Sequence, residues 1–176
     1  ILRCLVGSEM CIRDSFGGAA DKNAHIGLGG LGAHTTRDGM RAAKAAGVEF
    51  VNISPIRGDV LSECNAEWLA PRPNSDVAIM LAMAYTLVSE ELYSQAFVDR
   101  YCVGFDKFRP YLLGETDGQP KDPAWASGLS ELPADTIANL ARRMARSRTL
   151  VSVSWSIQRA EYGEQPFWMS VVLAAL

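Results

Sequence analysis

The sequence predicts an α/β fold in which a doubly wound, mostly parallel, Rossmann-like sheet carries helices on both faces. Three observations predict it: short β-rich runs alternate with helix-length segments, polar or glycine-rich loops follow those runs, and one helix-length segment is apolar nearly all round. Sheets of this class bind ligands at the carboxyl ends of their strands. The candidate site is therefore expected in the loops that follow the strands.

The two ends of the chain are interpreted separately from the fold. Residues 5–15 (LVGSEMCIRDS) look like a translated sequencing-library adapter, so residues 1–15 are left outside the predicted partial domain, which covers residues 16–176. The alternative, a genuine N-terminal strand and loop, stays open. Residues 167–176 are predicted to form a helix with no stop signal. These features favour an internal fragment that holds an incomplete sheet.

The first half of the domain begins with a capped helix. Thr35 or Thr36 can cap a helix that runs through Ala46 and stops at Gly47. Residues 48–53 are β-rich and end at a Ser-Pro pair, which predicts a buried strand that leads into a loop. The elements expected next are a helical turn at 60–64, an edge strand at 67–70 and a proline-bracketed loop at 71–75.

The second half is predicted to be mostly helical. Residues 76–89 are apolar on every side, which predicts a buried helix with Met80 and Met83 as core residues. The elements expected after it are helices at 94–101 and 105–113, a turn-rich segment at 114–123, a helix at 133–147, a strand at 149–154 and a loop with turns at 155–164.

Composition excludes several classes of function. The formal net charge of −3 offers no basic field for nucleic acid, and no apolar run approaches the roughly 20 residues of a membrane span. A soluble protein is expected. Outside the adapter-like segment, Cys64 and Cys102 match no metal or redox spacing. His25 and His34 are interpreted as loop and helix-entry residues, so no metal site is expected from this chain.

The segment Gly27–Gly32 (GLGGLG) satisfies the G-x-G-x-x-G pattern and precedes a helix. A nicotinamide-dinucleotide-dependent dehydrogenase is therefore one alternative function. Against it, no hydrophobic strand leads directly into the glycines, and the next strand ends at Asn52-Ile53 instead of the acidic residue that would bind a ribose hydroxyl. A second alternative is a non-catalytic Rossmann-like binding domain, whose loops would not converge on one pocket.

Several separated blocks, in order, resemble the molybdopterin oxidoreductases of the dimethyl sulfoxide reductase family. The likeness is greatest to the biotin sulfoxide and trimethylamine N-oxide reductase branch. The blocks are FGG with KN at 16–23, ISPIR at 53–57, RPNSD at 72–76 leading into the apolar helix, and WSIQR at 155–159 followed by GEQ at 163–165.

The resemblance implies a bis(molybdopterin guanine dinucleotide) cofactor with molybdenum, used to reduce an S-oxide or N-oxide. The implied cofactor-binding residues are Lys22, Asn23, Ser54, Pro55, Asn74, Ser75, Asp76, Trp155, Ser156 and Arg159. A serine metal ligand is implied upstream of this chain, so no catalytic residue or metal ligand is assigned and the segment alone is expected to be inactive. An electron-donor protein or a quinol-linked cytochrome is the implied partner, and the location is periplasmic or cytoplasmic, with the family favouring the periplasm.

The implied roles are physically reasonable. Gly17 and Gly18 can bring backbone amides close to a diphosphate, and Lys22 can add a compensating charge. The Asp76 carboxylate can accept hydrogen bonds from N1 and N2 of guanine and so reject adenine. Helix N-capping is the alternative role for Asp76.

Overall fold

The computed structural model describes residues 11–19 and 34–176, which fall into two compact units. The first unit comprises Ile1–Ala70 and Ser147–Trp155, and the second comprises Pro71–Arg146 and Ser156–Leu176.

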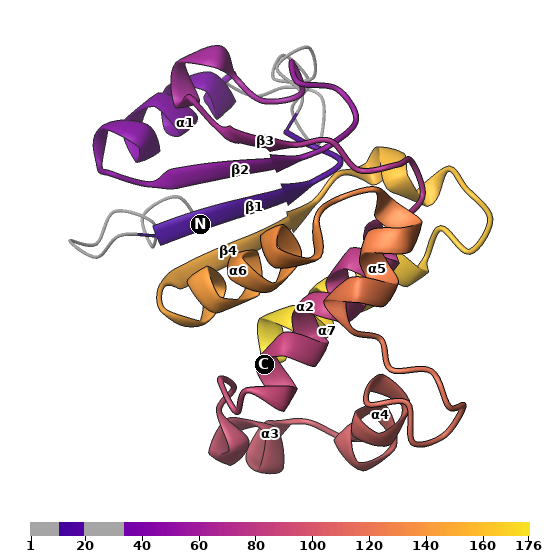
Figure 1. The fold of residues 1–176 in the computed structure, drawn as a ribbon. Helices are drawn as coiled ribbons and strands as arrows, with labels where there is room; N and C mark the ends of the chain where they lie inside the picture. Colours follow the sequence, from indigo (N-terminus) through magenta and orange to yellow (C-terminus); the bar gives the residue numbers. More distant parts are fainter. Residues whose placement is uncertain (1–10, 20–33) are drawn as a thin grey trace. The chain divides into compact units, whose positions relative to one another are not determined.

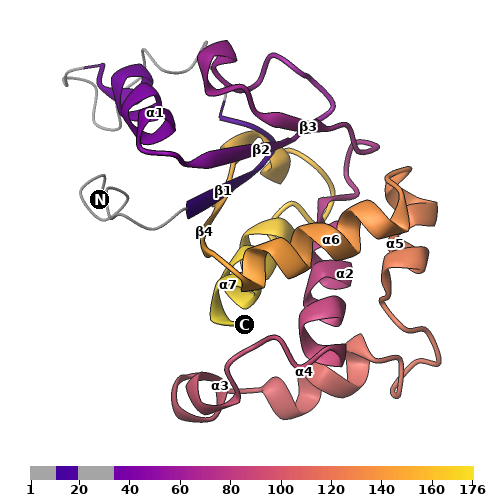
Figure 2. The same ribbon diagram turned by 60° about the vertical axis from the view of Figure 1, so that its left-hand side comes forward.

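A parallel sheet forms the first unit. Its strands are β1 (Cys11–Phe16), β2 (Glu49–Ile53), β3 (Glu67–Leu69) and β4 (Arg148–Val153). They lie side by side in the order β3-β2-β1-β4, and every pairing is parallel (Figures 1 and 2). The register places Phe16 opposite both Ile53 and Val153, so three strands end at one edge. The predicted α/β class with a parallel sheet is confirmed.

Helix α1 (Thr36–Ala45) completes the core of this unit together with the short helix η3 (Ser62–Cys64). Met40 and Ala43 on the buried face of α1 pack in one cluster with Val48 and Phe50. The helix ends where predicted, with Gly47 at a left-handed φ of 88°. Thr35 stands at the N-cap, but its side chain makes no cap hydrogen bond.

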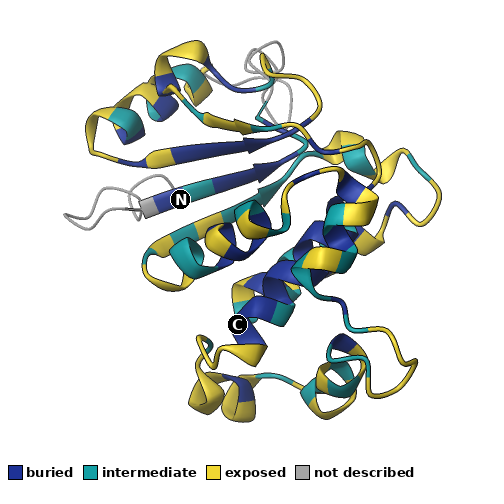
Figure 3. Cartoon of the chain, viewed as in Figure 1, coloured by how far each residue is buried: buried dark blue, intermediate teal, exposed yellow. Residues whose placement is uncertain are grey.

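The second unit is built around helix α2 (Asp76–Ser89), which has the predicted bounds. Its neighbours are α4 (Phe105–Leu112), α5 (Pro123–Ser130), α6 (Ala134–Ala145) and α7 (Gln165–Ala175), and α3 (Gln95–Tyr101) follows it in the chain. Figure 3 shows α2 buried along most of its length, and Met80 and Met83 are core residues as predicted. No helix in the part of the chain that the structure describes is long and apolar enough to cross a membrane.

Two elements differ from the sequence-based expectations. Strand β1 includes residues 11–15, which were left outside the domain, and pairs with a strand on each side. Central parallel strands are normally continuous apolar runs, whereas this one carries Arg13 and Asp14. The adapter origin of residues 1–15 stays a prediction. Helix α5 was not predicted at all, although Asp122 accepts a hydrogen bond from the N–H of Trp125 (2.7 Å) and so caps its start.

Candidate functional site

The carboxyl ends of β1 and β4 meet in the first unit at the point where the strand order reverses. The chain passes from β1 to β2 on one side, while β4 lies on the other, and such a reversal is where sheets of this class bind ligands. The N–H of Ser154 donates to the carbonyl of Phe16 (2.8 Å), and the hydroxyls of Ser152 and Ser15 are 3.2 Å apart. These two hydrogen bonds therefore join the carboxyl ends of β1 and β4.

The glycine turn after β1 does not offer its amides to a ligand. Gly17 and Gly18 have φ of 72° and 73°, a conformation that favours glycine. The N–H groups of Gly17, Gly18 and Ala19 donate to the carbonyls of Ile53 (2.8 Å), Ser15 (3.2 Å) and Asp59 (2.6 Å). The expectation that Gly17 and Gly18 present free amides to a diphosphate is therefore wrong. The turn connects β1 to the loop after β2.

Ser54 is buried within the loop that follows β2. Its hydroxyl donates to a carboxylate oxygen of Asp59 (2.8 Å) and accepts from the N–H of Ile56 (3.2 Å). The buried amide of Asn52 donates to the carbonyls of Ile56 (3.3 Å) and Arg57 (3.2 Å). These bonds hold the loop in one conformation, with Ser54 inside it and Pro55 and Arg57 exposed.

The close approach of Gly18 to Asp59 gives a test of the contact between the glycine turn and the loop after β2. A Cβ on Gly18 would lie 2.5 Å from the Cβ of Asp59, and the positive φ adds backbone strain. Gly18→Ala is expected to destabilise the chain by about 1–3 kcal/mol in urea unfolding. Gly58→Ala is the matched control, because a Cβ there meets nothing within 4 Å. Equal stability of the two variants would contradict the proposed contact.

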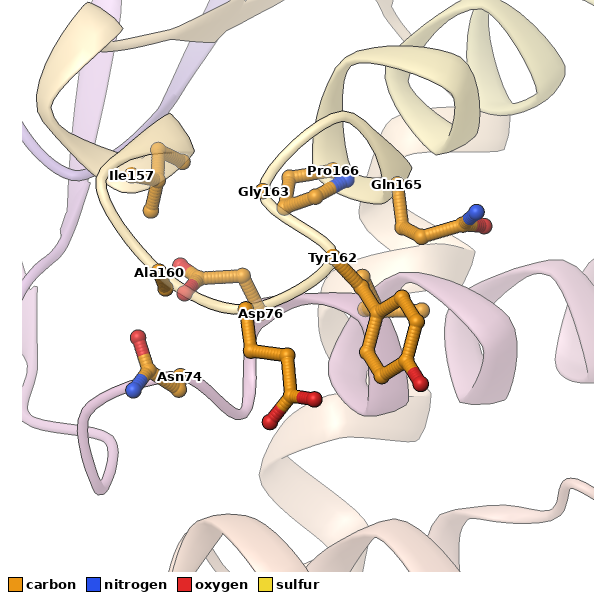
Figure 4. A pocket seen from close by; sticks show the side chains of 10 residues that line it. Asn74, Asp76, Ile157, Ala160, Tyr162, Gly163, Gln165 and Pro166 are labelled. Carbon is orange, nitrogen blue, oxygen red and sulfur yellow. The ribbon is translucent and has the colours of Figure 1, made fainter.

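The second unit contains a pocket between the N-terminus of α2 and the loop before α7 (Figure 4). Its volume is about 330 Å³, at the lower end of the range for small-molecule sites, roughly 300–1,000 Å³. The lining residues are Asn74, Asp76, Val77, Ile157, Ala160, Glu161, Tyr162, Gly163, Gln165 and Pro166. They include two carboxylates, two amides and one aromatic ring, and within residues 11–19 and 34–176 no Lys or Arg lines the pocket. The pocket therefore suits a neutral group rich in hydrogen-bond donors better than an anion.

Asp76, the first residue of α2, is the polar centre of this pocket. The residue is only 8% exposed, and this burial raises the pKa of its carboxyl above the usual value. A hydrogen bond from its own backbone N–H and its position at a helix N-terminus partly offset that cost. Among the described residues no ion pair neutralises it. A buried carboxylate of this kind gains from a partner that donates hydrogen bonds.

The turn before α2 sets the direction of Asp76. The hydroxyl of Ser75 donates to the carbonyl of Arg72 (2.6 Å), while Arg72 in turn donates its N–H to the carbonyl of Ser130 (2.8 Å). Asn74 adopts a left-handed φ of 66° and is exposed at the pocket. Ser75 stands at the N-cap without a side-chain cap bond, so its hydroxyl stabilises the turn and not the helix start.

The opposite wall is a compact loop between η4 (Trp155–Gln158) and α7. Gly163 is buried, and a Cβ there would overlap the backbone carbonyl of Gln158. Its N–H donates to the carbonyl of Ala160 (3.1 Å), and the N–H of Gln165 donates to the carbonyl of Tyr162 (3.0 Å). Tyr162 has a left-handed φ of 57°. The loop is thus folded tightly enough to fix the backbone from which the tyrosine side chain leaves.

Comparison with known sequences identifies the family. Residues 31–176 match the sequence model of the molybdopterin oxidoreductases. The chain belongs to this family. It is 47% identical over 143 residues to a dimethyl sulfoxide/trimethylamine N-oxide reductase from Rhodobacter capsulatus, which covers 81% of the chain and 17% of that protein. The match to a biotin sulfoxide reductase from Cereibacter sphaeroides is 40% over 161 residues, or 92% of the chain and 22% of the relative.

The molybdopterin oxidoreductase chain also resembles a solved structure of this kind of fold. An acetylene hydratase from Pelobacter acetylenicus matches 99% of the chain and 23% of its own length, with a TM-score of 0.73 and 16% identity. At that identity the likeness concerns the fold alone. The chain spans about a fifth of the length of the curated relatives it matches.

The structure brings together only some of the residues implied by the family resemblance. Asn74 and Asp76 line the pocket, and Ser75 supports them. Ser156 and Arg159 are exposed but do not line the pocket, and Ser54, Pro55 and Trp155 belong to the other unit. Lys22, Asn23, His25 and the Gly27–Gly32 loop lie outside the described residues.

The loop wall was largely missed by sequence reasoning. The GEQ block at 163–165 was noticed as a likeness, but Tyr162 and Glu161 beside it carried no assignment. Within residues 11–19 and 34–176, no group of three or more His, Cys, Asp or Glu side chains is placed to hold a metal.

Proposed function

We propose that this chain is a segment of a molybdenum enzyme that reduces an S-oxide or N-oxide, and that it binds the guanine end of a bis(molybdopterin guanine dinucleotide). Its family supports a molybdenum–molybdopterin cofactor, and relatives 40–50% identical are named as dimethyl sulfoxide, trimethylamine N-oxide and biotin sulfoxide reductases. The activity belongs to the whole polypeptide, of which this segment is a part.

The observation that carries the guanine assignment is the buried carboxylate of Asp76 at a pocket whose described lining residues include no Lys or Arg. Guanine presents N1–H and N2–H donors on one edge, and a carboxylate accepts both. Adenine presents an acceptor at N1, which would face the carboxylate unfavourably. Asp76 in this environment therefore favours guanine, and a hydrogen-bonded partner would offset its cost of burial.

The remaining residues have supporting roles in this proposal. Asn74 offers an amide beside Asp76, and Ser75 keeps the turn in place. Exposed Arg159 supplies positive charge for phosphate or pterin oxygens, and Lys22, outside the described residues, is proposed to add a second charge. Trp155 and Ser156 offer an indole surface and a hydroxyl. Ser54 and Pro55, in the loop after β2, and Asn23, outside the described residues, are proposed as further contacts of the cofactor. When bound, the molybdenum cofactor supplies the redox chemistry, which removes the oxygen atom from the oxide and takes electrons from a donor.

The wider setting follows from the same proposal. The substrate is a small S-oxide or N-oxide, and the electrons come from a donor protein or a quinol-linked cytochrome. A periplasmic location is proposed over a cytoplasmic one because export is common in this family.

The test of the activity uses the full-length polypeptide that contains this segment. Expressed with molybdenum, it is expected to reduce dimethyl sulfoxide, trimethylamine N-oxide or biotin sulfoxide with a reduced viologen as donor. Expression in medium depleted of molybdenum is the control and should abolish that activity. A protein that instead binds a nicotinamide dinucleotide and oxidises or reduces it without molybdenum would favour the dehydrogenase alternative.

A further inference from the structure

We infer that Tyr162 provides the aromatic surface on which the purine base stacks in the Asp76 pocket. This inference rests on the proposed guanine-binding function and deepens it, because it assigns a residue to recognition of the base plane, whereas Asp76 recognises the base edge. Tyr162 lines the same pocket as Asp76, across from the helix that carries the carboxylate.

The exposure of Tyr162 is the first argument. The residue is 70% exposed, and Figure 4 shows its ring projecting away from the loop that carries it. Among the described residues no aromatic ring stacks on it, although pairs such as Phe97–Tyr101 occur elsewhere in this unit. The ring therefore has a free face beside a pocket.

The fixed backbone beneath the ring is the second argument. Tyr162 has a φ of 57°, and its carbonyl accepts the N–H of Gln165 (3.0 Å). The adjacent Gly163 lies too close to the Gln158 backbone for any larger residue. A tyrosine that only contacts solvent has no need of this uncommon backbone conformation. A stacking residue, in contrast, benefits from a backbone that is held in place before the ligand binds.

The chemistry of the lining is the third argument. Asp76 and Glu161 make the pocket acidic, so a phosphate group is disfavoured there and a flat, uncharged ring with N–H donors is favoured. Stacking is indifferent to the identity of the base, while hydrogen bonds to its edge are not. The two residues should therefore affect binding in different ways.

The experiment compares Tyr162→Ala and Tyr162→Phe in the 176-residue chain, with GMP and IMP as probes in calorimetric titrations. Tyr162→Ala is expected to weaken both nucleotides by the same factor, about tenfold, and Tyr162→Phe to bind as the unaltered chain does. Both variants keep a side chain at the left-handed position, so backbone strain stays matched. Tyr101→Ala, another exposed tyrosine outside the pocket, is the control and should leave binding unchanged.

Acid release of GMP from the full-length protein provides a second measurement that does not depend on the isolated chain. The Tyr162→Ala protein is expected to retain less guanine nucleotide after gel filtration than the Tyr162→Phe protein. If Tyr162→Ala binds and retains nucleotide as well as Tyr101→Ala does, the stacking role is wrong while guanine binding stands. Loss in Tyr162→Phe as well would assign the effect to the hydroxyl and overturn the inference. If no variant, nor the unaltered chain, binds GMP and no GMP is released, the proposed function itself fails.

Discussion

Asp76→Asn is expected to abolish guanine recognition while making the unliganded chain more stable at neutral pH. The amide would keep one acceptor but place an N–H group against a guanine donor, so both charge-assisted hydrogen bonds are lost. Such bonds contribute about 1.5–3 kcal/mol each, so a loss of about 3 kcal/mol or more, roughly 100-fold in the Kd for GMP, is expected. AMP binding should change far less. Titration of GMP and AMP measures the difference.

The gain in stability follows from the pKa of Asp76. Burial raises that pKa in the folded chain above its value in the unfolded chain. Below the unfolded pKa of about 4 the carboxyl is protonated in both states and costs nothing. As pH rises through the folded pKa, the buried charge penalises the folded state. The stability advantage of Asp76→Asn in urea unfolding should therefore be absent near pH 4 and grow towards neutrality.

A matched control separates the effect of burying the Asp76 carboxylate from the effect of its position at a helix N-terminus. Asp135 also lies in the first turn of a helix, α6, but is exposed and outside the pocket. Asp135→Asn should lower stability by about 0.3–1 kcal/mol through the helix dipole and leave GMP binding unchanged. Were Asp76→Asn to behave in the same way, the carboxylate would be a helix-end residue and not a base-recognition residue.

Gly163→Ala is expected to open the loop wall of the pocket. The added Cβ overlaps the Gln158 backbone, which cannot move without displacing the turn that carries Tyr162. Overpacking against backbone should cost about 1–3 kcal/mol of stability and reduce GMP binding together with it. Hydrogen exchange should rise at the N–H groups of Gly163 and Gln165, which are bonded within this loop.

Gly128→Ala gives the matched comparison for this substitution. Gly128 is exposed in α5, and a Cβ there meets nothing within 4 Å. Replacement of a helical glycine by alanine should stabilise the chain by about 0.5–1 kcal/mol and leave the pocket intact. A Gly163→Ala chain that is as stable as Gly128→Ala and binds GMP normally would contradict the tight loop.

The extent to which sequence predicts this molecule depends on how local each signal is. Helix α2 was predicted to its exact bounds because a proline-rich turn ends at Asp76 and the following residues are apolar on every side. Strand β1 is only the alternative in the sequence-based prediction, because residues 5–15 look like a translated sequencing-library adapter and are left outside the domain. Arg13 and Asp14 also interrupt the apolar run that a central strand normally shows. Burial lowers the pKa of Arg13 in that strand, a cost that sequence patterns do not anticipate.

The residues of the candidate site likewise differ in whether a local sequence signal identifies them. Asp76 is found from its place in the RPNSD block, which is contiguous in the chain. Tyr162 joins it from far along the sequence through tertiary packing, and nothing in the residues around it signals which way the ring points. The glycine turn at residues 17 and 18 was located from sequence, but its amides are paired within the sheet and its role is structural.

The most direct test of guanine recognition is the nucleotide released when the full-length, molybdenum-loaded protein is treated with acid. The expected result is GMP in stoichiometric amount with molybdenum, reduced in the Asp76→Asn protein and unchanged in Asp135→Asn. Release of AMP or CMP instead, or of no nucleotide at all, would contradict the assignment of Asp76 to guanine.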